Sequence, residues 1–238
     1  MVSARGLGFR LRSRDILAAV DFALPRGAFL AVVGENGAGK TTLLDLLLGF
    51  RRRTIGDLVV LDHDPGTDPW RTRLRIAYLS EKVDLPGDWE AREFLEFHRR
   101  FYPSYDRQEE AALMGRLGVR GDTVLGTMSA GEIRRVQIAG ALAARPDLLI
   151  ADEITALLDI LGRRLFLTLV RERQQTSGLT TVLATNVPEG LDAYADHVLL
   201  ISQGRQVSFS GLASFIGSEN TLADAVAGAL TSHARALP

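Results

Sequence analysis

The chain has 238 residues, of which 46% are hydrophobic and 24% charged, a size and balance that suit one large α/β domain with a smaller lobe. Its formal net charge of −1 gives no electrostatic reason to expect nucleic acid as the main partner. The absence of cysteine excludes a disulfide framework and thiolate metal sites.

Targeting and membrane-spanning segments are not expected. Residues 1–15 have no apolar core of the length that a signal peptide needs. The most apolar stretch, Leu43–Phe50, is interrupted by Asp45 and Gly49 and falls short of the ~18 apolar residues of a spanning helix. We therefore expect a partner to supply any role at a membrane.

A glycine-rich loop lies between the first predicted buried strand and the first predicted helix. Phe29–Val33 predicts the strand, and Lys40–Leu48 predicts a helix that stops at Gly49. The sequence between them fits G-x-x-x-x-G-K-[ST], in which glycines let successive backbone N–H groups face phosphate oxygens. The candidate phosphate-binding residues are Gly34, Glu35, Asn36, Gly37, Ala38, Gly39, Lys40, Thr41 and Thr42. Lys40 would supply charge to the β/γ-phosphates, and the Thr41 hydroxyl could coordinate Mg²⁺. A chance glycine turn is the weaker interpretation, because a strand and a helix flank the loop.

Residues 82–145 have the pattern of a helical subdomain inserted into an α/β core. Apolar residues recur there at helical spacings among charges, and no strand is predicted. They are Trp89, Phe94, Leu95, Phe97, Phe101 and Leu113. The core is then predicted at residues 1–81 and 146–217, with Pro146 closing the insertion and an alanine-rich helix at 218–238.

A second notable helix start lies near the end of this insertion. Ser129, followed three residues later by Glu132, forms a capping box, and the helix is predicted to run to Arg145. This structural interpretation is sufficient for both residues. A helix N-terminus that begins with small residues is also a site for anions, so a binding role stays open.

Two carboxylates follow the next predicted strand. Leu148–Ala151 is apolar, and Asp152 and Glu153 come directly after it. Beside a phosphate loop, a carboxylate at a strand end can hold Mg²⁺, and a second one can polarise the attacking water. We assign Asp152 to the metal and Glu153 to the water. The alternative is an ordinary strand end with solvated acids.

The strand and helix patterns alternate along the chain, which predicts an α/β fold with a mainly parallel sheet. Thr181–Ala184 is a further candidate for a buried strand. His197–Ser202 and Arg205–Phe209 flank Gln203-Gly204 and predict a hairpin.

Taken together, these residues resemble the ATP-binding cassette (ABC) family over nearly the whole chain. The phosphate loop is similar to its Walker A sequence, and Leu148–Glu153 to its Walker B sequence with the catalytic glutamate. Ser129-Ala130-Gly131-Glu132 resembles the family signature, usually Ser-Gly-Gly-Gln or Ser-Gly-Gly-Glu, which faces the γ-phosphate held by the other subunit. The resemblance makes Ser129 and Gly131 nucleotide-binding candidates. It implies a P-loop NTPase fold with a mainly parallel core sheet, an antiparallel N-terminal β portion and an inserted α-helical subdomain.

Several positions depart from the family pattern. Glu81 stands where a glutamine is usual, and it remains a candidate Mg²⁺ ligand beside Thr41 and Asp152. Ile154–Asp159 keeps the final aspartate of the usual segment but loses its serine and glycine. Asn186 stands where a histidine usually contacts the γ-phosphate. Asparagine can form a hydrogen bond there but carries no charge, so the resemblance gives Asn186 a modified catalytic role.

The residue that would stack on adenine is ambiguous. Leu11 occupies the aligned position, and Phe9 lies two residues before it. A core strand position is the better interpretation of Phe9.

The resemblance implies an ATP-binding and ATP-hydrolysing subunit of a bacterial transporter, with ATP and Mg²⁺ as cofactors. Such a subunit pairs with a second cassette, as a homo- or heterodimer, and drives integral membrane permease subunits from the cytoplasmic face. Residues 101–106 resemble those of export-type members.

Two alternatives stay open. A soluble member acting on nucleic acid or the ribosome is disfavoured by the near-neutral charge and by the lack of a long coiled-coil insertion or a second cassette. A hydrolytically weak regulatory subunit is suggested by Asn186. Because Lys40, Asp152 and Glu153 are all present, we favour an active but slow ATPase.

Overall fold

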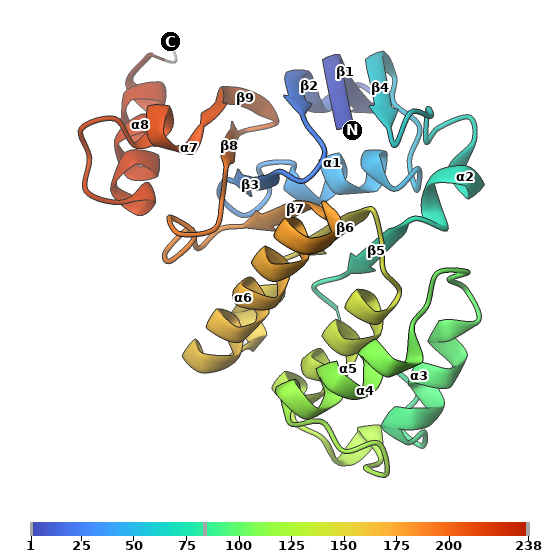
Figure 1. The fold of residues 1–238 in the computed structure, drawn as a ribbon. Helices are drawn as coiled ribbons and strands as arrows, with labels where there is room; N and C mark the ends of the chain where they lie inside the picture. Colours follow the sequence, from blue (N-terminus) through green and yellow to red (C-terminus); the bar gives the residue numbers. More distant parts are fainter. Residues whose placement is uncertain (1, 83–84, 237–238) are drawn as a thin grey trace.

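The computed structural model describes residues 2–82 and 85–236, which form one nine-stranded sheet with helices on both faces (Figure 1). The strands are β1 (Val2–Leu11), β2 (Arg14–Leu24), β3 (Phe29–Val33), β4 (Ile55–Val60), β5 (Ile76–Leu79), β6 (Leu148–Asp152), β7 (Thr180–Thr185), β8 (His197–Ser202) and β9 (Arg205–Gly211). The α-helices are α1 (Lys40–Leu47), α2 (Pro69–Arg73), α3 (Ala91–Arg99), α4 (Arg107–Leu117), α5 (Ala130–Ala143), α6 (Ile160–Ser177), α7 (Leu212–Ile216) and α8 (Leu222–Ala236). Short 3-10 helices span Leu125–Thr127 and Ile154–Leu157.

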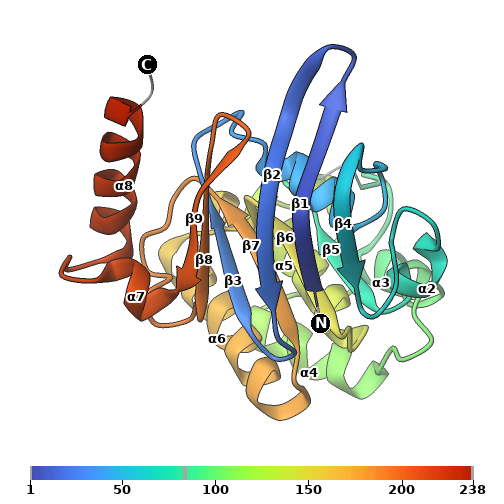
Figure 2. The same ribbon diagram turned by 90° about the horizontal axis from the view of Figure 1, so that it is seen from above.

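The sheet combines a parallel core with an antiparallel portion, as the sequence predicts. Its strand order is β4-β1-β2-β9-β8-β3-β7-β6-β5. Five adjacent strands run parallel to one another, namely β5, β6, β7, β3 and β8, and β9 pairs antiparallel with β8. Both β2 and β4 pair antiparallel with β1, so the N-terminal strands lie together at one end of the sheet (Figure 2). The strand predictions are confirmed, and the predicted hairpin is β8–β9.

Alternate residues of the central strands pack against different helices. Leu30 and Val32 of β3 belong to the apolar cluster that includes α1 and the N-terminal strands. Ala31 and Val33 belong to the cluster that includes α5 and α6. Since successive side chains of a strand point to opposite faces, α1 and α5 cover opposite faces of the sheet (Figure 1). This arrangement decides which predicted site residues can meet within one chain.

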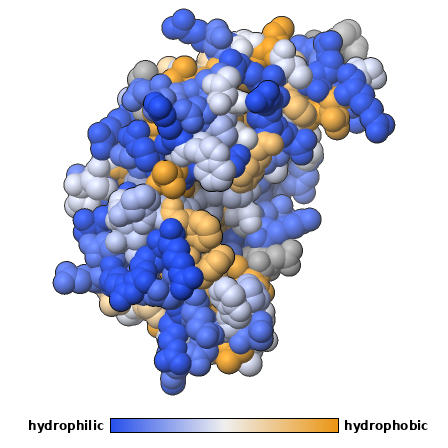
Figure 3. Space-filling view, turned by 90° about the vertical axis from the view of Figure 1, so that its right-hand side faces the viewer, coloured by the Kyte–Doolittle hydropathy of each residue, from blue (hydrophilic) through white to orange (hydrophobic). Residues whose placement is uncertain are grey.

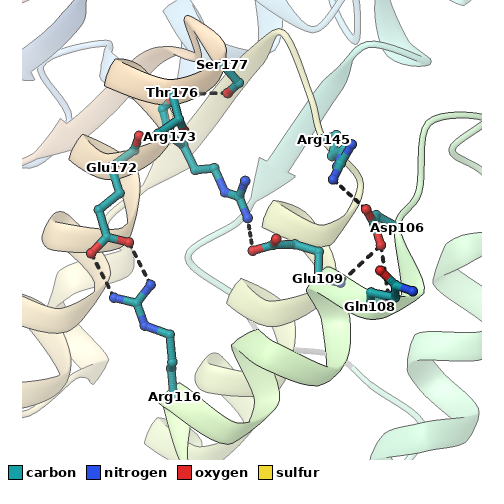
Figure 4. Close-up of polar contacts among 9 residues, drawn as sticks. All are labelled: Asp106, Gln108, Glu109, Arg116, Arg145, Glu172, Arg173, Thr176 and Ser177. Atoms are coloured by element: carbon teal, nitrogen blue, oxygen red, sulfur yellow. Dashed lines mark hydrogen bonds and ion pairs between the residues drawn. The ribbon is translucent and has the colours of Figure 1, made fainter.

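The described residues between 85 and 145 contain α3, α4 and α5 and no strand longer than a single bridge. Their helical character is therefore as predicted, while residues 83–84 of the predicted insertion lie outside the described ranges. Ion pairs join α4 and its N-terminus to α6 and to the end of α5 (Figure 4). These pairs are Arg116–Glu172 (2.6 Å), Arg145–Asp106 (2.5 Å) and Arg173–Glu109. They are partly exposed, so each contributes little by itself.

The predicted C-terminal helix corresponds to α8, which begins at Leu222 and is described as far as Ala236. Residues 237–238 of that prediction are not among those described. None of the helices in the described ranges combines the length and the apolar character needed to span a bilayer.

Candidate functional site

The loop between β3 and α1 is shaped by its glycines. Gly37 and Gly39 have φ angles of 78° and 104°, a region that residues with a side chain rarely adopt. A Cβ at Gly34 would lie 2.2 Å from the Ile201 carbonyl oxygen, so β8 approaches the loop too closely for any other residue. The Gly204 N–H donates to the Ala38 carbonyl at 2.9 Å. The loop is therefore fixed from behind by the β8–β9 turn, while Glu35, Asn36 and Gly37 are exposed.

Lys40 lies along the inside of this loop with only 6% of its surface exposed. Its Nζ donates to the carbonyl oxygens of Gly34 (2.8 Å) and Glu35 (3.2 Å) and lies 3.2 Å from Glu153 Oε1. No side-chain hydrogen bond caps the first turn of α1, which begins at Lys40. An ammonium group and the positive end of a helix thus face the same loop, which favours an anion.

Thr41 and Asp152 meet across the end of the sheet. The Thr41 hydroxyl donates to Asp152 Oδ2 at 2.9 Å. Asp152 Oδ1 is buried and has no hydrogen-bond partner among the described residues. Burial is the main cause of the raised pKa of Asp152, and the nearby carboxylates of Glu153 and Glu81 raise it further. Asp152 therefore has an unsatisfied oxygen atom and lacks a neighbouring cation strong enough to offset its burial.

These oxygen donors fit a magnesium ion. Mg²⁺ prefers hydroxyl, carboxylate and phosphate oxygens, and usually takes only one or two carboxylates from the protein. Thr41 and Asp152 supply such donors, and the unsatisfied Asp152 Oδ1 marks where a cation would be stabilised. The described residues contain no group of three or more histidines or carboxylates arranged around a metal position. Glu81 is exposed, and no hydrogen bond in the described ranges joins its carboxylate to Thr41 or Asp152.

Glu153 and Asn186 lie together at the open side of the loop. Glu153 follows β6 directly and has a φ angle of 47°, a conformation uncommon for residues other than glycine and often found at functional sites. The Asn186 N–H donates to Glu153 Oε2 at 3.2 Å. The Asn186 side-chain amide donates to Asn36 Oδ1 at 3.1 Å. Asn186 therefore contacts both the candidate general base and the phosphate loop, in addition to following β7.

Ser129 and Gly131 lie elsewhere. They belong to the first turn of α5, where the predicted capping box is confirmed: Glu132 Oε2 accepts from both the backbone N–H and the hydroxyl of Ser129 at 2.8 Å. These hydrogen bonds lower the pKa of Glu132, with the one from the Ser129 backbone as the largest cause. Across the described residues, no hydrogen bond or ion pair connects this turn to the phosphate loop. The resemblance assigns this turn to the nucleotide of the other subunit, and in the structure α5 packs on the opposite face of the sheet from α1, which follows the loop.

Phe9 and Leu11 are the two positions considered for stacking on adenine. Phe9 packs against the apolar cluster of α1, and the Arg51 guanidinium lies 5.4 Å from its ring centre, which supports the core interpretation. Leu11 is 53% exposed.

No sequence pattern identifies Arg134, whose guanidinium donates to the carbonyl oxygens of Ser80 and Glu81. Nothing in the sequence distinguishes Arg134 from its neighbour Arg135, because only the contacts of α5 decide which of the two is buried.

The family model of ABC transporters matches residues 17–156, more than half of the chain and all of the loop, α5 and β6. The ABC transporter ATP-binding protein MK0182 of Methanopyrus kandleri is 35% identical over 188 residues, covering 76% of this chain and 70% of that protein. The chain belongs to the ABC transporter family. It is an ATPase subunit of the ABC transporter type.

Other relatives differ in the direction of transport that their names state. The hemin import ATP-binding protein HmuV of Streptomyces coelicolor is 34% identical, with 86% of this chain and 76% of that protein covered. The putrescine export system ATP-binding protein SapF of Escherichia coli is 29% identical, with 88% and 82% covered. The family is therefore established for this ABC subunit, and the direction of transport is not.

Solved structures agree on the fold. An ATP-binding subunit of an ABC transporter superposes with a TM-score of 0.87 at 23% identity, covering 97% of this chain and 99% of that one. The ATP-binding cassette MJ0796, in a dimeric post-hydrolysis state bound to ADP and phosphate, superposes with a TM-score of 0.78 at 20% identity, covering 89% and 99%. The curled nine-stranded sheet with its helices is thus the ABC cassette fold.

Proposed function

We propose that this ABC subunit binds MgATP at Gly34–Thr42 and hydrolyses it between two cassettes, thereby driving a membrane partner. The observation that carries the proposal is the convergence of Lys40, the Thr41–Asp152 pair and Glu153 at the exposed phosphate loop. Lys40 would bind the β/γ-phosphates, and Thr41, Asp152 and Glu81 would hold Mg²⁺. The metal would offset phosphate charge.

Glu153 is the proposed general base. Its Oε2 already accepts from the Asn186 N–H, so the carboxylate is oriented by the strand end that follows β7. Its Oε1 is buried and faces the Lys40 ammonium without a well-aligned hydrogen bond. Phosphate oxygens compete for that ammonium, so nucleotide binding would free Glu153 Oε1 to accept a proton from water.

The split between the loop and the first turn of α5 supports a two-chain site. Ser129 and Gly131 lie at a helix N-terminus that, among the described residues, makes no hydrogen bond or ion pair with the loop of its own chain. Dimerisation would bring that turn to the nucleotide of the other chain, as the family signature does. Exposed apolar residues lie nearby in Ile160 (87% exposed) and Leu161 (77%), the first residues of α6. Large exposed apolar side chains of this kind are typical of surfaces that another protein covers.

A second apolar surface supports a membrane partner. On the face that carries α2 and α3, apolar side chains gather in a hollow among hydrophilic ones (Figure 3). Trp89 packs edge-on against Phe97 with their ring centres 5.4 Å apart, and Phe97 packs edge-on against Phe101 with their ring centres 5.0 Å apart. Trp89 and Phe97 line a hollow of about 630 Å³ along α3, together with the charged residues Arg92, Glu93, Glu96 and Arg100. We propose this face for the permease subunits, with the cassette on the cytoplasmic side.

Export stays a prediction. Residues 101–106, which suggest export, also have a structural role in this chain: Asp106 caps α4, and the Ser104 hydroxyl donates to the Ala144 carbonyl. Relatives named for import and for export both match.

The test uses the Glu153→Gln variant, in which bound ATP should persist. Light scattering after gel filtration should give a dimer with MgATP and a monomer with MgADP or without nucleotide. A monomer in all three conditions would contradict the two-chain site, provided that nucleotide binding is verified by calorimetry and that a second, different cassette has been supplied.

A further inference from the structure

Arg134 is a buried cation with an unusual set of partners. It lies in the second turn of α5 and is the largest of the fully buried side chains in the described ranges. Its Nη1 donates to the Ser80 carbonyl (2.5 Å) and to Gln137 Oε1 (3.0 Å), and its Nη2 donates to the Glu81 carbonyl (2.7 Å). In the described ranges, no carboxylate lies within ion-pair distance of it. A buried charge without a counter-ion is costly, so these carbonyls are essential partners.

The two segments that Arg134 joins are both parts of the proposed site. Ser80 and Glu81 directly follow β5, whose last residue, Leu79, pairs with Ala151 of β6, the residue before Asp152. On the other side, Arg134 lies about one turn beyond Ser129 and Gly131 on the same helix. One rigid guanidinium therefore connects a candidate metal ligand of this chain to the turn proposed for the other chain's nucleotide.

We propose that Arg134 is a positioning residue that holds Glu81 in place for Mg²⁺ and couples it to the position of α5. This inference rests on the proposed function and adds a residue to it. A guanidinium can bond two adjacent carbonyls at once because its donors form a planar fork. When a neighbouring cassette displaces the first turn of α5, the Ser80–Glu81 segment must follow, so the two nucleotide sites of a dimer communicate through this contact.

The alternative is that Arg134 only fills space between α5 and β5. The two interpretations differ in their effect on the metal. A space-filling role affects stability alone, whereas a positioning role affects the extra nucleotide affinity that Mg²⁺ provides.

The experiment measures affinity for a fluorescent ATP analogue in EDTA and in Mg²⁺, in the Glu153→Gln background so that nucleotide is not consumed. Arg134→Met keeps much of the volume and removes the donors, and Arg120→Met is the matched control at an exposed arginine paired with Asp122. Affinity in EDTA should stay within about twofold, because the phosphate loop is untouched. The gain on adding Mg²⁺ should fall about tenfold, the lower end for a residue that orients a metal ligand.

Two further variants make the test decisive. Glu81→Gln should lose a similar part of the Mg²⁺ gain, and the double variant should lose no more than either single one, since both act through one ligand. Arg134→Lys keeps the charge without the fork and should lose the gain as well; it decides the question if Arg134→Met does not fold. A full Mg²⁺ gain in Arg134→Met, or losses that add to those of Glu81→Gln, would overturn the inference. Absence of any Mg²⁺ gain in the parent chain would instead overturn the proposed function.

Discussion

The phosphate loop and the first turn of α5 are built in opposite ways. The loop is fixed by the sheet: β8 packs behind Gly34, and Lys40 and Asp152 are buried beside it. The first turn of α5 is largely exposed, and its polar groups find hydrogen-bond partners within the turn, because Ser129 donates to Glu132. The loop is therefore prepared for an anion by tertiary structure, whereas the α5 turn is a local structure that any chain with this helix would form.

The pKa values of two carboxyl groups in these regions shift in opposite directions, for different reasons. Burial raises the pKa of Asp152, and hydrogen bonds from Ser129 lower the pKa of Glu132. The Thr41 hydroxyl and Lys40 offset the burial of the Asp152 carboxylate only in part, so a cation would stabilise it further, while Glu132 is stabilised without one. A nucleotide with its metal would change the energy of the loop far more than that of the α5 turn.

The largest effect is expected at Glu153, on the loop side. Glu153→Gln should lower the rate of phosphate release by about 10²–10⁴-fold, because the amide cannot accept a proton from water. ATP affinity should not fall, because the variant removes the ion pair between Glu153 and Lys40 and so leaves the Lys40 ammonium available to the phosphates. Enzyme-coupled phosphate detection measures the rate, with exposed Glu219→Gln as the control. A rate within twofold of the parent chain would exclude Glu153 as the base.

Removing the buried cation should have the next largest effect. Lys40→Ala should weaken MgATP binding by about 1.5–3 kcal/mol, roughly 10- to 150-fold, which is the range for a hydrogen bond to a charged group. Isothermal calorimetry measures it, with Arg235→Ala on α8 as a control for loss of positive charge. Unchanged affinity in a folded variant would mean that nucleotide binds elsewhere.

The contrast between the two regions also explains what the sequence could predict. The loop, the strand Phe29–Val33 and the capping box at Ser129 depend on neighbouring residues, so local patterns locate them. The distance between the α5 turn and the loop depends on which face of the sheet each helix covers. Local spacing carries no information about that, so only the family resemblance assigns the α5 turn to the nucleotide of a second chain.

Arg134 and Asn186 show the same limit at single residues. Arg134 is buried and its neighbour Arg135 is half-buried because of the contacts of α5, a tertiary property. The departure at Asn186 is visible in the sequence, but its contacts with Glu153 and Asn36 come from strands far apart along the chain.

Asn186 offers a gain of activity on the loop side. A histidine there can donate a stronger hydrogen bond to the developing charge on the γ-phosphate than a neutral amide can. Asn186→His should therefore raise turnover at saturating MgATP by up to about tenfold, equivalent to ~1.4 kcal/mol at the transition state. Asn186→Ala, which keeps the backbone N–H to Glu153, should not. Equal rates in all three chains, with product release shown not to limit turnover, would leave Asn186 as the end of a strand.

The smallest effect is expected on the α5 side, where a stability change and a functional change can be separated. Ser129→Ala removes the helix cap and should cost about 1 kcal/mol, a fall of about 2–4 °C in the thermal midpoint for a chain of this size. Ser129→Asp keeps an acceptor for the helix N-terminus, but it loses the hydroxyl hydrogen bond to Glu132 and places a second carboxylate beside that residue. Its midpoint should therefore fall to about that of Ser129→Ala. Its carboxylate, however, would face the anion that the other cassette brings to this turn, and repulsion should reduce turnover below that of Ser129→Ala. If Ser129→Asp is as active as the parent chain, the α5 turn only caps a helix. If turnover falls below that of Ser129→Ala while the two variants have similar midpoints and the affinity of a single chain for MgATP is unchanged, the turn acts on the nucleotide of the second chain.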